Sequence, residues 1–191
     1  VSNHKLNTNY NMSDHYIAIV PKLSVYIDRE NKAKEILDWL VGLDIVKPVA
    51  TDCVLGKDEG YPISAGARLI TTEPKHLPFD LVTNGLEIST DRQIYDTGGN
   101  GTEEVICPHC SQDIVNEDWA FLEEWSQNKS NNLICPLCNV GTDIHQFKFT
   151  PEMGFSDLGF VFWNWICLTE RFIGEFKQKL GCDVNIVHAQ I

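Results

Sequence analysis

Alternating and helical patterns of apolar residues predict a strand followed by a helix at the start of the chain. His15 to Pro21 alternates in a way that leaves both faces apolar, which is typical of a short buried strand. From Asp28 to Leu43, apolar residues recur at helical spacing and form one stripe. Asp28 is a suitable residue for the N-cap of this helix. The first part of the chain is therefore expected to bury one helix face against a strand.

The last part of the chain repeats this pattern. Leu158 to Trp165 predicts a strand, and the residues after it carry apolar side chains at helical spacing. Gly181 is placed to end that helix as a C-cap. Asp183 to Ala189 then alternates again, which predicts a closing strand.

Between these ends the pattern is weaker. Prolines and glycines interrupt candidate strands near Ile45 to Leu55 and Ala67 to Thr71. Leu81 to Thr90 contains Asn84-Gly85, a dipeptide that favours a type I′ turn, so we expect a β-hairpin there. Asp96 to Thr102 is rich in glycine and is expected to be a flexible boundary.

Two βαβ-like halves that flank an inserted segment predict an α+β fold, and specifically a ferredoxin-like sandwich with its helices on one face of the sheet. Four parts are expected: a flexible extension (1–14), an α+β N-terminal half (15–102), an insertion (103–149) and a strand–helix–strand C-terminal half (150–191) that packs with the N-terminal half.

The aromatic run within the last strand raises the question of what covers it. Alternation places Val161, Trp163 and Trp165 on the face opposite Phe160 and Phe162. Two exposed tryptophans would leave a large apolar area in water. We expect the inserted module to cover this face, and a second copy of the chain or a protein partner is the alternative. Val161, Trp163 and Trp165 are thus a possible interaction surface.

Composition and charge narrow the classes of function. The chain has 191 residues, is 43% hydrophobic and carries 27 Asp and Glu against 15 Lys and Arg, a net charge of −12. Disorder is excluded by the apolar content, and the negative charge disfavours nucleic acid and anionic membranes as partners. No apolar stretch is long enough to cross a bilayer, and no secretory signal pattern is present. A soluble cytoplasmic protein is therefore expected.

The seven cysteines supply the clearest chemical signal. Cys107-Pro-His-Cys110 and Cys135-Pro-Leu-Cys138 are two matched turns, each able to aim two thiolates at one cation. Together they complete the tetrahedral ligand set of one structural Zn²⁺ and leave no open position for a catalytic water. Cys53, Cys167 and Cys182 stand alone and are expected to be buried apolar thiols.

From Glu104 to Phe149 the sequence resembles the zinc-ribbon and zinc-knuckle modules, in which two such turns clamp one zinc ion. The resemblance implies ligand roles for the four paired cysteines and extends to no other part of the chain. A helix expected from Asn116 to Asn128, with Asn116 as its N-cap, departs from an all-β ribbon. A knuckle–helix–knuckle arrangement is the alternative, and Trp119 and Trp125 are candidates to pack on the main domain.

Other interpretations remain open. Cys-Pro-His-Cys also resembles the active-site motif of thioredoxin-like oxidases, which points to a dithiol oxidoreductase, but that interpretation leaves the second matched turn unexplained. An acidic inhibitor that neutralises a basic partner, as nuclease-inhibiting immunity proteins do, fits the charge. Asp143 and His145 could bind a second metal, although a strand-edge histidine is the commoner arrangement. We expect a zinc-binding protein that acts through protein contact or self-association, without catalysis.

Overall fold

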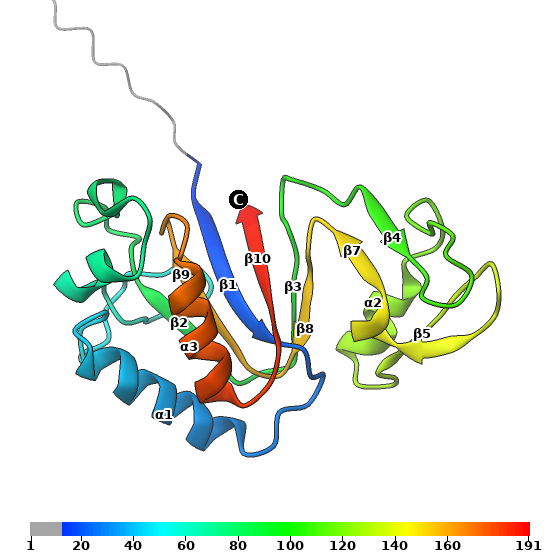
Figure 1. Cartoon of the computed structure of the whole chain (residues 1–191), viewed down its shortest axis with the longest axis horizontal. Helices are drawn as coiled ribbons and strands as arrows, with labels where there is room; N and C mark the ends of the chain where they lie inside the picture. Colours follow the sequence, from blue (N-terminus) through cyan, green and yellow to red (C-terminus); the bar gives the residue numbers. More distant parts are fainter. Residues whose placement is uncertain (1–12) are drawn as a thin grey trace, which may run out of the picture.

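The largest sheet of the molecule holds four antiparallel strands (Figure 1). A computed structural model describes residues 13–191, so the extension expected for residues 1–14 lies almost wholly outside the described residues. The strands follow the order β10-β1-β9-β2, with bounds β1 His15–Pro21, β2 Leu86–Ser89, β9 Gly159–Trp163 and β10 Val184–Gln190.

Two helices cover one face of this sheet (Figure 1). Helix α1 (Arg29–Gly42) follows β1, and helix α3 (Glu170–Leu180) connects β9 to β10. Numbered along the chain, the four strands lie in the order fourth, first, third, second. This is the arrangement of a ferredoxin-like sandwich, in which each strand–helix–strand half straddles a strand of the other half. The predicted α+β class is confirmed.

Each helix buries a single apolar stripe against the sheet. The buried residues of the two stripes are Ala33, Ile36, Leu40, Phe172, Phe176 and Leu180. Helix α3 begins at Thr169, whose hydroxyl accepts the N–H of Phe172 at 3.3 Å, and ends at Gly181 with φ 71°, as predicted. Asp28 precedes α1, but its carboxylate accepts the Asn31 side-chain amide and caps no backbone N–H.

The opposite face of the sheet is covered by the loop around Cys53 and by β3 (Gln93–Tyr95), and not by the inserted module, residues 103–149, as expected. Val161 and Trp163 are 3% and 5% exposed, and they pack with Cys53, Val54 and Tyr95. The indole N–H of Trp163 donates to a buried carboxylate, that of Glu87, at 2.9 Å.

Trp165 lies on the helix side of the sheet, which corrects the face assigned to it by strict alternation. Asn164 has φ 60°, so the strand ends there and the chain turns. Trp165 is then fully buried in the core with Phe162, and its indole N–H donates to the Asn84 carbonyl at 2.7 Å. Val161, Trp163 and Trp165 therefore form no exposed interaction surface.

The segment between α1 and β2 is mostly irregular, and several expected elements are wrong. Residues 65–69 form a 3-10 helix, η1 (Ala65–Leu69), where a strand was expected, and a second one, η2 (Pro74–His76), follows. Only isolated bridges, including Val46 with Ile63, mark the strand expected over 45–55.

The hairpin predicted around Asn84-Gly85 is also absent. Both backbone N–H groups of this dipeptide donate to the Cys53 carbonyl, and a Cβ on Gly85 would lie 2.2 Å from the Cys53 sulfur. The glycine therefore permits close packing, and β2 pairs with β9 instead.

The inserted module lies beside the sandwich and is built from short elements (Figure 1). Its own strands pair as β4 with β7 and β5 with β6, and the pair of β3 with β8 lies outside residues 103–149, where the chain enters and leaves the module. Their bounds are β3 Gln93–Tyr95, β4 Glu104–Ile106, β5 Asn132–Ile134, β6 Gly141–Asp143, β7 Lys148–Thr150 and β8 Gly154–Ser156, and the helices are α2 Ala120–Ser126 and the 3-10 helix η3 Ile144–Gln146. Helix α2 is shorter than expected, and Asn116 lies four residues before it and does not cap it.

One arginine and one tryptophan join the module to the sandwich. Trp125 of α2 is buried and donates its indole N–H to the hydroxyl of Ser24, in the loop after β1, at 3.0 Å. The Arg92 guanidinium lies 3.8 Å from the Trp125 ring centroid and donates to the Trp125 carbonyl at 2.6 Å. Trp119 bonds within the module, to the Val115 carbonyl. Trp125 alone of the two tryptophans thus fulfils the expected packing role.

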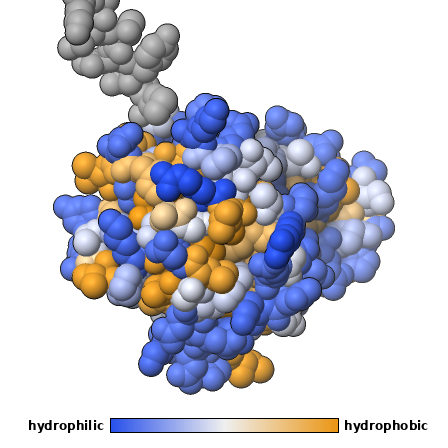
Figure 2. All heavy atoms as spheres, turned by 60° about the vertical axis from the view of Figure 1, so that its left-hand side comes forward, coloured by the Kyte–Doolittle hydropathy of each residue, from blue (hydrophilic) through white to orange (hydrophobic). Residues whose placement is uncertain are grey.

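Several apolar side chains are exposed on one side of the sandwich. Figure 2 shows them gathered over the loops around η1 and the end of α1. The exposed residues of this side are Leu43, Val49, Leu55, Leu69, Leu81 and Val82.

Candidate metal centre

Four cysteine sulfurs meet where the two Cys-Pro-x-Cys turns of the inserted module approach each other. The sulfurs of Cys107, Cys110, Cys135 and Cys138 all lie within 4.8 Å of one another. The Sγ–Sγ distance is 3.9 Å for Cys107 and Cys138 and 3.8 Å for Cys110 and Cys135. A tetrahedral ion with metal–sulfur bonds of about 2.3 Å requires sulfur separations of about 3.8 Å, whereas a disulfide requires about 2.05 Å. The cluster therefore has the spacing of a tetrahedral metal site.

The two cysteine turns have the same backbone structure. In each, the residue after the second cysteine donates its N–H to the carbonyl of the first: Ser111 to Cys107 at 3.0 Å and Asn139 to Cys135 at 2.8 Å. Ser111 and Asn139 share a left-handed φ of 58°. The first turn follows β4 and is closed by the bridge between Ile106 and Asp113. The second turn follows β5 and leads into β6, which pairs with β5. Both knuckles thus lie at hairpin ends, as in the zinc ribbons that the sequence resembles.

The surroundings of the sulfurs shift the thiol pKa values in ways that favour binding of a cation. Burial opposes ionisation of Cys107, but N–H groups of Cys110 and His109 directed at its sulfur lower its pKa to about 7. The N–H of Val140 favours the Cys138 thiolate, yet burial and hydrogen bonds from the Cys138 thiol to the other cysteine sulfurs raise the pKa of Cys138 to about 12. One thiolate therefore forms readily, and further thiolates need a bound cation beside them.

The donor set indicates the kind of ion. Four thiolates are soft ligands, and four sulfurs in tetrahedral arrangement are typical of zinc or iron. All four positions belong to the protein, so no ligand position is left for water or substrate. The residues fit a metal ion with a structural role.

Neighbouring polar residues stay outside the ligand set. His109 is exposed, and its Nε2 lies 2.6 Å from the Thr142 hydroxyl, which links the first knuckle to β6. The Asp143 carboxylate accepts the backbone N–H of His145 at 2.9 Å, so this pair forms a local turn. Within residues 13–191, the four cysteines are the only group of three or more ligands placed to share one ion.

The three remaining cysteines differ from one another in solvent exposure. Cys53 is buried as expected, and Cys182 is half-buried. Cys167 is exposed, so its prediction as a buried thiol is wrong. It follows the chain reversal that begins at Asn164, beyond the end of β9.

Apolar side chains surround the second knuckle, a feature that the sequence interpretation missed. Ile134, Leu137 and Val140 are 64%, 49% and 38% exposed within a single turn of seven residues. A side chain that lies between two metal ligands of one tight turn points away from the ion. Applied to Leu137, which lies between Cys135 and Cys138, this rule could have predicted the exposure from the sequence.

Comparison with family models, with curated proteins and with solved structures finds no match for this chain. Among residues 13–191, none of the helices has the length and apolar character that crossing a lipid bilayer requires.

Proposed function

We propose that this chain is a zinc protein in which one structural Zn²⁺, held by Cys107, Cys110, Cys135 and Cys138, fixes a module that binds a protein partner without catalysis. The sulfur spacing of the cluster carries the metal assignment. Zinc is the ion for which two matched Cys-Pro-x-Cys turns are the common ligand set. The free thiols suit a reducing compartment such as the cytoplasm.

The local backbone favours zinc over dithiol redox chemistry. The reactive Cys-x-x-Cys pair of a thioredoxin-like oxidase stands at the N-terminus of a helix. Here both pairs are followed by a residue with φ 58° and a return to β-structure. The close approach of sulfurs from different turns also favours one shared ion.

Exposed apolar residues and charge support protein contact at the second knuckle. Ile134, Leu137 and Val140 project from a turn that the metal would hold rigid. Residues 103–149 carry eight Asp and Glu against two Lys and Arg, a net charge of −6, which four thiolates and one Zn²⁺ would take to −8. This charge favours a basic protein as partner and disfavours nucleic acid. An inhibitor of a basic enzyme is one form of such a protein.

Elemental analysis tests the metal assignment. The purified chain should contain one zinc per molecule, because four protein ligands give tight binding. Cys135→Ser should lower the zinc content strongly, and Cys167→Ser, a change at an exposed cysteine outside the cluster, should leave it at one. Bound iron, or no bound metal at all in protein prepared without chelator, would contradict the assignment.

Site-specific cross-linking tests the contact surface. A photo-reactive amino acid is placed at Leu137, and a control is placed at Leu69, which is 84% exposed on the sandwich. In cells that produce the protein naturally, Leu137 should yield one defined adduct with a basic protein, and Ile134→Asp should remove it. Identical adducts from both positions, or none from Leu137, would overturn the proposal of a partner at the knuckle.

A further inference from the structure

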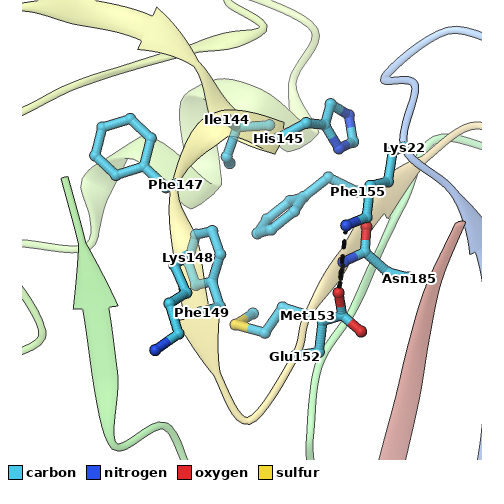
Figure 3. A pocket seen from close by; sticks show the side chains of 10 residues that line it. All are labelled: Lys22, Ile144, His145, Phe147, Lys148, Phe149, Glu152, Met153, Phe155 and Asn185. Carbon is cyan, nitrogen blue, oxygen red and sulfur yellow. Dashed lines mark hydrogen bonds and ion pairs between the residues drawn. The ribbon is translucent and has the colours of Figure 1, made fainter. Parts of the chain in front are cut away.

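A cavity of about 190 Å³ lies where the inserted module meets the sandwich (Figure 3). Its apolar wall is formed by the end of the module and the segment that follows it, and includes Phe149, Met153 and Phe155, all of which are buried. The rings of Phe149 and Phe155 lie 5.2 Å apart. Lys22, at the end of β1, and Asn185 of β10 face this wall from the sandwich. The cavity thus combines an aromatic side with a polar side.

The polar side is held in place by a network around Glu152. Its carboxylate accepts the Asn185 amide at 2.6 Å and the Ile186 backbone N–H at 3.3 Å, and lies 3.5 Å from the Lys22 ammonium. Asn185 is itself buried. Three donors therefore occupy the carboxylate, while the Lys22 ammonium makes one ion pair in the described chain and keeps further N–H groups for a ligand.

His145 also lines this cavity. Its Nε2 lies 3.3 Å from the Ser24 hydroxyl, and that hydroxyl accepts the indole N–H of Trp125 at 3.0 Å. The Ser24 hydroxyl therefore links His145 to Trp125 of α2. Burial lowers the pKa of His145; Asp143 opposes this shift, and the charges of Lys22 and Arg92 add to it. The charged groups that line the cavity are two lysines, Lys22 and Lys148, and one carboxylate, that of Glu152.

The size of the cavity limits the ligand. A cavity of about 150 Å³ holds one benzene molecule, so about 190 Å³ admits a single ring and a small polar group. Aromatic rings and a thioether favour a flat apolar body, and the available donors favour an anionic head. We propose that this cavity binds a small anion with one aromatic ring, of the aromatic carboxylate class, its carboxylate on Lys22 and its ring against Phe149 and Phe155.

A titration of the zinc-loaded full chain with benzoate, followed by NMR, tests this site. Benzoate should bind with a Kd of about 1 mM or lower and shift the signals of Ile144, Met153 and Asn185. Benzamide has the same shape without the charge, and acetate has the charge without the ring. Each should bind about ten-fold more weakly than benzoate.

A lysine variant locates the anion contact. Lys22→Met keeps the length of the side chain and removes its charge, and it should weaken benzoate about ten-fold while leaving benzamide unchanged. Lys47→Met, at an exposed lysine outside the cavity, is the matched control and should have no effect. If Lys22→Met does not fold, the three probes on the unmodified protein still decide. Equal binding of acetate and benzoate, no shift at the cavity residues, or full affinity in a folded Lys22→Met variant would overturn the proposal.

Discussion

At the scale of single residues, the seven thiols occupy three different environments. Four share the metal cluster, Cys53 and Cys182 are partly or wholly enclosed, and Cys167 is exposed. Burial raises the pKa of both Cys53 and Cys182, which leaves little thiolate to react at neutral pH. A thiolate bound to a metal ion is likewise shielded from reagents. Reactivity should therefore separate the cysteines into groups.

A thiol-reactive dye should count these groups. On the metal-loaded chain we expect one rapidly reacting thiol, Cys167, because it alone is both exposed and outside the cluster. After a strong chelator removes the metal, four more thiols should react. The measurement is the dye absorbance with time, and Cys167→Ser, which should lose only the first phase, is the control. Rapid reaction of five thiols before chelation would contradict metal binding at the cluster.

At the scale of elements, helix α3 has one glycine within it and a second at its C-cap, and the two differ in backbone conformation. Gly174 lies within the helix, and a Cβ built there meets no atom within 4 Å. Gly181 ends the helix with φ 71°, and a Cβ there also has open space. Since neither site is crowded, the backbone conformation alone decides how a glycine-to-alanine substitution changes the free energy of unfolding.

The same substitution should consequently have opposite effects at these two positions. Gly174→Ala should stabilise the chain by about 0.5–1 kcal/mol, because alanine restricts the unfolded backbone and favours helix. Gly181→Ala should destabilise it by about 1 kcal/mol, since an L-residue is strained in the left-handed region. Urea unfolding of both variants measures the difference. Shifts of equal sign would show that packing decides instead.

The elements also show how far sequence patterns predict this fold. Strands β1, β9 and β10 and helices α1 and α3 were predictable because their apolar periodicity matches what they bury. Trp165 was misplaced because a single residue, Asn164, breaks the alternation by adopting φ 60°. Asn84-Gly85 gave a false hairpin because the local turn preference yields to packing against Cys53. Where one tertiary contact decides the backbone, local pattern cannot reveal it.

At the scale of the whole molecule, some functional features could be predicted from the sequence and others could not. The clustering of the four cysteines was predictable, because a tetrahedral metal site requires two short turns with this spacing in the sequence. The cavity was not, because Lys22, His145, Glu152 and Asn185 come from four separate segments of the chain. The covering of Trp163 by Cys53, Val54 and Tyr95 likewise depends on contacts between segments distant in sequence. Only the folded chain brings such groups together.

The molecule has separate hydrophobic cores in its two parts, and this predicts what metal removal does. One core lies between α1, α3 and the sheet, and another fills the inserted module around Trp125 and includes Cys107 and Cys135. A unit of about 45 residues rarely folds on apolar burial alone. Bound zinc supplies stabilisation on the order of 10 kcal/mol in comparable small modules. The module should therefore depend on the metal, and the sandwich should not.

Hydrogen exchange on the full chain measures this dependence. After chelation, amide protection should be lost in β4, β5, β6 and α2 and retained in β1, β9 and α3. Acid should act in the same direction: the metal-free cluster binds more protons than the metal-bound one, so the metal is held more weakly as the pH falls. Restoring neutral pH with zinc should restore protection, and Cys167→Ser should behave as the unmodified chain. Loss of protection in both parts together would mean that the Arg92–Trp125 junction couples them into one cooperative unit.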